Sequence, residues 1–145
     1  GAAQAPPPDV SAQSAIVIEQ VTGKVLYEKN GRRKVYPAST TKIVTALLAI
    51  ESGDLDRVFP IPGAAVGVEG SSIYLSAGEK ISLRDLVYGL MLRSGNDAAT
   101  AISCLIDRST EAFVQKMNER VQAMGAMDTH FMNPSGLFDE IIILM

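Results

Sequence analysis

The chain has few of the residues on which metal and redox chemistry depends. Its 145 residues include one histidine, His130, one cysteine, Cys104, and no tryptophan. A zinc site made of cysteine and histidine needs three or four such ligands, and a disulfide needs two cysteines. A Ser-His-Asp triad would have only His130 as its base. Any chemistry must therefore use serine, lysine, asparagine, tyrosine or carboxylate side chains.

The chain also lacks a basic charge excess and a long hydrophobic run. Its net charge of −3 argues against a nucleic-acid partner. The apolar run 141–145 is far shorter than a transmembrane helix, and residues 1–12 show neither the basic nor the apolar part of a signal peptide. We expect residues 1–12 to be a flexible proline-rich lead. With 47% hydrophobic and 20% charged residues, the remainder is typical of a globular domain.

Hydrophobic periodicity and turn residues predict a hairpin followed by helices. The β-rich runs 15–20 and 24–29 flank Gly23, which can adopt the positive φ of a tight turn. The segment 38–52 is apolar on nearly every side, which is typical of a buried helix. Further expected elements are extended pieces at 58–59 and 73–75, helices at 82–92, at 97–106 and around Phe113, Met117, Val121 and Met124, and a turn at 133–136.

The first candidate site is Ser39-Thr40-Thr41-Lys42, at the start of the expected buried helix. Ser39 and Lys42 are three residues apart, so their side chains lie on one helix face. Burial and the positive end of the helix dipole both lower the pKa of a lysine at this place. A neutral Lys42 can then accept the proton of the Ser39 hydroxyl. The alternative is that Ser39 only caps the helix and Lys42 extends to solvent.

The second candidate site is Ser94-Gly95-Asn96, in the break between two expected helices. A hydroxyl and an amide at such a break can project into a cleft. The alternative is an ordinary helix N-cap, for which serine and asparagine are favoured residues. Taken alone, this motif therefore does not distinguish a site from a cap.

Three motifs occur in a fixed order along the chain: Pro37-Ala38-Ser39-Thr40-Thr41-Lys42, Leu92-Arg93-Ser94-Gly95-Asn96-Asp97-Ala98-Ala99 and Asn133-Pro134-Ser135-Gly136-Leu137. With them the chain resembles the serine-type D-alanyl-D-alanine carboxypeptidases, the low-molecular-mass penicillin-binding proteins. The resemblance runs from about residue 13 to residue 138. It implies an α+β fold of the β-lactamase/transpeptidase type, in which an antiparallel sheet and a helical lobe enclose the active site.

The resemblance also implies the chemistry. Ser39 would be the nucleophile, Lys42 its base, Ser94 the group that relays a proton to the departing D-alanine, and Asn96 a substrate-binding residue. The substrate would be the peptidoglycan stem peptide that ends in D-Ala-D-Ala, and β-lactams would acylate Ser39 as inhibitors. No metal and no organic cofactor is implied. The family places the protein outside the cytoplasm, at the bacterial cell envelope.

One family motif is absent. The sequence contains no Lys-Thr-Gly, and residues 139–145 do not resemble the family pattern beyond Leu137. We therefore interpret residues 13–138 as the N-terminal part of a catalytic domain and 139–145 as a tail that does not match. The missing C-terminal strands are expected from a second polypeptide, unless the chain is a truncated product. The alternative functions are a β-lactamase, which shares Ser-x-x-Lys, and a non-catalytic penicillin-binding or sensor fragment.

The lone histidine and the lone cysteine have simpler interpretations. His130 is expected to be a surface or structural residue, since nothing around it indicates a base. Cys104 falls on the apolar face of the helix expected at 97–106 and is interpreted as part of the core. The run Arg32-Arg33-Lys34 is expected to be a solvated loop.

Overall fold

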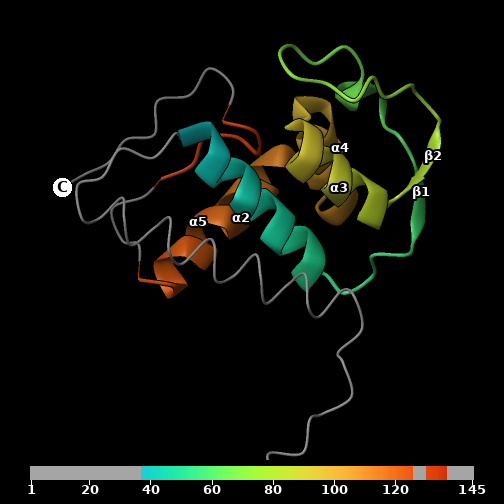
Figure 1. Cartoon of the computed structure of the whole chain (residues 1–145). Helices are drawn as coiled ribbons and strands as arrows, with labels where there is room; N and C mark the ends of the chain where they lie inside the picture. The colour runs from blue at the N-terminus through green and yellow to red at the C-terminus, as the bar shows by residue number, and fades with distance from the viewer. Residues whose placement is uncertain (1–36, 126–129, 137–145) are drawn as a thin grey trace, which may run out of the picture.

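A computed structural model describes residues 37–125 and 130–136; the side chains of 37–39 are outside that description. Four α-helices make up most of this part, with a short antiparallel sheet beside α3 (Figure 1). The predicted hairpin at 15–29 lies outside the described residues. In chain order the elements are α2 (Pro37–Glu51), β1 (Val58–Pro60), the 3-10 turn η1 (Gly63–Ala65), β2 (Lys80–Ser82), α3 (Leu83–Arg93), α4 (Asn96–Ile106) and α5 (Thr110–Ala123).

Helix α2 is the centre of the described part. It packs against α3, α4 and α5, and Figure 1 shows it crossing α5 with α3 and α4 to one side. Val44, Ala46 and Ala49 are completely buried, and Leu47 is 1% exposed. A helix that has no polar face can be stable only when other elements cover it on all sides. The predicted buried central helix is therefore confirmed.

Helices α3 and α5 begin at serine caps, of which the sequence indicated only the one at Ser82. The Ser82 hydroxyl accepts a hydrogen bond from the Asp85 N–H at 3.1 Å at the start of α3. Ser109 caps α5 in the same way by accepting from the Ala112 N–H at 3.1 Å. Each cap satisfies one of the N–H groups that have no partner within the helix. The predicted helices at 82–92 and 97–106 are thus confirmed to within one residue at each end.

The sheet corresponds to only part of the extended structure that we expected. Strands β1 and β2 pair antiparallel, with Phe59 opposite Ile81. The expected extended piece at 58–59 is confirmed as β1, but the piece expected at 73–75 does not form a strand. The N–H groups of Ile73 and Leu75 are bonded to the carboxylate of Asp97, and that of Tyr74 to the Ser72 hydroxyl, instead of to a neighbouring strand. A side chain takes the place of a partner strand here.

The predicted turn at 133–136 is confirmed and is attached to the helices. The Asn133 side-chain oxygen accepts hydrogen bonds from the N–H groups of Ser135 at 3.0 Å and Gly136 at 2.6 Å. From α2, the buried Thr45 hydroxyl donates to the Pro134 carbonyl at 2.6 Å. These bonds hold the turn against the central helix. Within the ranges described here, no helix is both long enough and apolar enough to span a bilayer.

Candidate active site

The predicted nucleophile lies in the first turn of α2. This helix begins at Pro37, so Ser39 is its third residue and stands one turn before Lys42. Residues three apart on a helix share a face, so the backbone places both side chains on the same side of α2. The side chain of Ser39 itself lies outside the described residues. Its role as nucleophile therefore stays a prediction that rests on its helix position.

Lys42 links the two candidate motifs. Its side-chain nitrogen donates a hydrogen bond to the carbonyl oxygen of Ser94 at 2.6 Å, across 52 residues of sequence. The side chain is partly buried, and loss of solvation lowers the pKa of Lys42 below its ordinary value of 10.5. The amine therefore ends on a specific backbone oxygen of the second motif. A lysine whose pKa is lowered by burial can act as a general base, so the role of Lys42 as base stays a prediction.

Ser94 occupies a sharp turn between α3 and α4. Its backbone is left-handed, with φ 53° and ψ 35°, and its N–H closes α3 by donating to the Gly89 carbonyl. Such a conformation costs about 1–3 kcal/mol in a residue other than glycine and is concentrated at functional sites. Here the turn directs the Ser94 carbonyl toward Lys42, and the residue itself is exposed. The predicted break between the helices is therefore a tight, specific turn.

Asn96 begins α4 and is 4% exposed. Its side-chain amide donates to the Glu69 carbonyl at 2.9 Å, and its backbone N–H donates to the Ser71 carbonyl at 2.8 Å. The side-chain bond uses one of the two hydrogens of the amide and fixes the plane of the group. The N-cap of α4 is Gly95, so Asn96 is not the helix cap; its bonds to Glu69 and Ser71 attach that segment to the start of α4.

Asp97 is a residue of the site that sequence reasoning missed. It is 1% exposed, and its carboxylate accepts hydrogen bonds from Ser72 Oγ, Ile73 N and Leu75 N at 2.9–3.2 Å. In the sequence it looked like an ordinary acidic residue in the first turn of a helix, where a carboxylate is favourable. Only its long-range bonds reveal its second function, and no local pattern encodes them.

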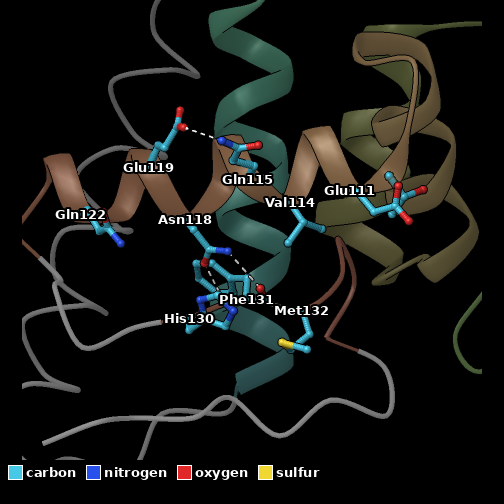
Figure 2. Close-up of a pocket in the computed structure, with 10 residues that line it drawn as sticks. Glu111, Val114, Gln115, Asn118, Glu119, Gln122, His130, Phe131 and Met132 are labelled. Atoms are coloured by element: carbon cyan, nitrogen blue, oxygen red, sulfur yellow. Dashed lines mark hydrogen bonds between the residues drawn. The ribbon is translucent and has the colours of Figure 1, made fainter.

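Other candidate residues lie apart from these contacts. His130 is exposed and lines a pocket beside α5 with Asn118 and Met132, as Figure 2 shows. This agrees with its interpretation as a surface residue. Cys104 is a free cysteine of intermediate burial, so its assignment to the core is only partly right. Across 37–125 and 130–136, no three His, Cys, Asp or Glu side chains gather as metal ligands would.

Comparisons with known proteins agree with the motifs. A sequence profile of the family Peptidase_S11, described as D-alanyl-D-alanine carboxypeptidase, matches residues 1–142. The D-alanyl-D-alanine carboxypeptidase DacF of Bacillus subtilis is 40% identical over an alignment of 134 residues that covers 89% of this chain and 34% of that protein. DacB2 of Mycobacterium tuberculosis is 35% identical over 136 residues, 94% of this chain and 46% of that protein. The chain thus spans between a third and a half of these relatives.

Solved structures of proteins from the same family are similar to the fold of this chain. The D-alanyl-D-alanine carboxypeptidase DacD of Francisella tularensis superimposes with a TM-score of 0.67 at 42% identity, over 72% of this chain and 26% of that one. Penicillin binding protein 6B of Escherichia coli gives a TM-score of 0.67 at 32% identity, over 73% and 37% of the two chains. These likenesses confirm the expected fold class, an α+β arrangement of the β-lactamase/transpeptidase type.

Proposed function

The chain belongs to the D-alanyl-D-alanine carboxypeptidase family, and from that premise we propose that it forms the nucleophile-bearing part of a serine DD-carboxypeptidase. The enzyme removes the terminal D-alanine from peptidoglycan stem peptides through an acyl-enzyme. The observation that carries the proposal is the bond from the Lys42 amine to the Ser94 carbonyl. It brings a lysine with a lowered pKa to the second motif without any histidine.

In the acylation step, the Ser39 oxygen attacks the carbonyl carbon of the penultimate D-alanine while its proton passes to the neutral amine of Lys42. The tetrahedral intermediate carries its negative charge on the former carbonyl oxygen. The Ser39 N–H, in the first turn of α2, supplies one donor to that oxyanion. When the peptide C–N bond breaks, the leaving nitrogen takes a proton through the Ser94 hydroxyl, and D-alanine departs. Water then hydrolyses the ester and restores Ser39.

The hydrogen bond of Lys42 is compatible with its role as base. A neutral primary amine has two N–H bonds and one lone pair. One N–H bond can remain on the Ser94 carbonyl, so the lone pair is held in a defined direction and accepts a proton without loss of this contact. Burial keeps a larger fraction of the amine neutral than in water because desolvation penalises the ammonium form.

Asn96 and the turn at Ser94 form the side of the cleft. We assign to Asn96 a hydrogen bond to the substrate peptide, made by the amide whose plane is fixed by the bond to Glu69. Penicillin, whose strained amide mimics D-Ala-D-Ala, acylates Ser39 in the same way. The 145 residues contain no Lys-Thr-Gly, so none of them is assigned to the substrate carboxylate. The comparisons give no support to a second polypeptide as the source of further strands.

The substrate and the family support a location for such an enzyme. Peptidoglycan is assembled outside the cytoplasm, so we place the protein at the bacterial cell envelope. The bacterial relatives are described as D-alanyl-D-alanine carboxypeptidases, and the proposal extends that activity to the polypeptide that contains this chain.

The test uses the whole natural polypeptide that contains these residues. It is incubated with a peptide ending in D-Ala-D-Ala, with a fluorescent penicillin and with a chromogenic cephalosporin. The proposal predicts release of D-alanine, one penicillin label per molecule and slow turnover of the cephalosporin. Rapid turnover of the cephalosporin would instead identify a β-lactamase. Labelling without release of D-alanine would identify a non-catalytic penicillin-binding protein.

A further inference from the structure

The segment 69–75 lies directly against the turn that carries Ser94 and Asn96. Glu69 and Ser71 offer their carbonyl oxygens to Asn96, at 2.9 and 2.8 Å. The side chain of Ile73 is so close that a Cβ atom added at Gly89 would lie 2.7 Å from it, and one at Gly95 would lie 3.2 Å from it. The segment is therefore part of the wall that borders the second motif.

The carboxylate of Asp97 holds this segment in place. It accepts hydrogen bonds from the Ser72 hydroxyl at 2.9 Å, from the Ile73 N–H at 3.1 Å and from the Leu75 N–H at 3.1 Å. It also accepts from the N–H of Ala98 in its own helix, at 2.9 Å. A buried carboxylate with this many donors is fully satisfied and is strongly directional. No strand is paired with 72–75 in the part of the chain that the structure describes, so Asp97 replaces one.

Tyr74 is the exposed aromatic residue of this segment. It has the left-handed φ of 58°, which residues other than glycine and asparagine rarely adopt, and its residue surface is 87% exposed. The Ser72 hydroxyl accepts from the Tyr74 N–H at 2.9 Å while it donates to Asp97, so the conformation is fixed from both sides. The exposure excludes a role for the ring in the core, and backbone strain of this kind is concentrated at functional sites.

We propose that the segment 71–75 is a peptide-binding wall of the cleft, in which the Tyr74 ring contacts the peptide that precedes the scissile bond and Asp97 is the positioning residue. This inference rests on the proposed function. Asp97 is buried and touches no substrate, so it acts only through the segment. A small β-lactam that lacks the preceding peptide does not reach the Tyr74 ring, and its reaction does not depend on the wall.

Asp97→Asn tests the positioning role. The amide keeps the size of the side chain but replaces one acceptor oxygen with an NH₂ group, which faces N–H or O–H donors that it cannot accept from. We expect KM for a D-Ala-D-Ala peptide to rise about tenfold, the loss typical of one good contact, with kcat changed much less. The rate constant for penicillin acylation should stay within about threefold of that of the wild type. The variant loses only a binding contact with the longer peptide, and penicillin does not make this contact. A merely structural defect would lower the labelled fraction and leave KM unchanged.

Two further variants make the test independent of folding defects. Tyr74→Gly suits the positive φ and removes the ring, so it should raise KM as Asp97→Asn does, whereas Tyr74→Phe should behave like the wild type. The double variant should lose no more than either single one, because both act on one contact. Asp107→Asn at the other end of α4, where the carboxylate bonds to Lys116 at 2.7 Å, is the matched control and should leave KM unchanged.

The two hypotheses fail in different ways. An unchanged KM for both Asp97→Asn and Tyr74→Gly, in an enzyme whose wild type releases D-alanine, overturns the peptide-binding wall alone. A wild type that neither takes the penicillin label nor releases D-alanine overturns the proposed function, and the wall with it.

Discussion

The side-chain nitrogen of Lys42 lies 2.6 Å from the carbonyl oxygen of Ser94. This bond connects the first turn of the buried helix α2 to the left-handed turn between α3 and α4. The contact depends on both ends, because the amine extends from a helix that is fixed by burial and the carbonyl direction is set by the φ of Ser94. The site is therefore a product of tertiary packing, although each half is encoded locally.

The pH dependence of acylation follows from the pKa of Lys42. Only the neutral amine can accept the Ser39 proton, and burial lowers the pKa below 10.5. The rate should therefore rise with pH up to an apparent pKa below that value and be lost as the amine becomes protonated at lower pH. Lys42→Arg cannot supply a neutral base, so it should slow acylation by about 10² or more. The measurement is the second-order rate constant for fluorescent penicillin across the pH range.

Lys42→Met is the control for packing in that experiment, because it keeps the apolar part of the side chain. It should fold and should acylate as slowly as Lys42→Arg. A pH-independent rate, or wild-type acylation by either variant, would show that Lys42 is not the base.

Gly89→Ala, a substitution in α3, tests the peptide-binding wall by displacing Ile73. A Cβ at this position would lie 2.7 Å from Cδ1 and 3.3 Å from Cγ2 of Ile73, so Ile73 and its segment must shift. Alanine stabilises a helix interior by about 1 kcal/mol over glycine, which offsets much of the cost of this shift. We expect little change in the melting temperature and a several-fold higher KM for the peptide. Steady-state kinetics and thermal denaturation measure the two effects.

Gly63→Ala provides the comparison for this substitution. Apart from Gly63 and its two chain neighbours, no atom of the described residues lies within 4 Å of a Cβ built at Gly63, so neither KM nor the melting temperature should change. If Gly89→Ala also left KM unaltered, the position of Ile73 would not matter to substrate binding.

Asn118 on α5 stabilises the C-terminal part of the described fold. Its side chain donates to the Phe131 carbonyl at 3.1 Å and accepts from the Phe131 N–H at 2.6 Å, as drawn in Figure 2. Phe131 is 1% exposed, so removal of the Asn118 amide would leave the N–H and the carbonyl of Phe131 without these partners beside the core. Asn118→Ala should therefore lower the free energy of unfolding by about 2 kcal/mol, measured by chemical denaturation.

Gln115→Ala on the same helix is the matched control for Asn118. Gln115 is exposed, and among the described residues its side chain bonds only to Glu119, at 3.3 Å, so its removal should change the free energy of unfolding by less than about 0.5 kcal/mol. Equal effects of the two substitutions would contradict the structural role of Asn118.

The sequence predicted those features that short-range chemistry determines. The cap at Ser82, the all-apolar helix α2 and the turn at Asn133 each depend on residues within a few positions of one another. The pairing of Lys42 with the second motif was expected only through the family resemblance, because no local pattern brings two segments 52 residues apart into contact.

The features that the sequence did not predict depend on long-range partners. Lys80–Ser82 has no strong strand pattern and becomes a strand because it pairs with Val58–Pro60. Ile73-Tyr74-Leu75 has a strand-like composition but bonds to Asp97 instead. In both cases the hydrogen-bond partner, which is distant in sequence, overrides the local propensity.

The central claim, that Ser39 is the nucleophile, is tested most directly by locating the penicillin adduct. After labelling and trypsin digestion, mass spectrometry should find the adduct on Ser39 within the peptide 35–42, and Ser39→Ala should take no label. Thr40→Val is the matched control, because the Thr40 hydroxyl is buried and has no hydrogen-bond partner among the residues described. It should label like the wild type. An adduct on any other residue, or labelling of Ser39→Ala at the wild-type rate, would contradict the account.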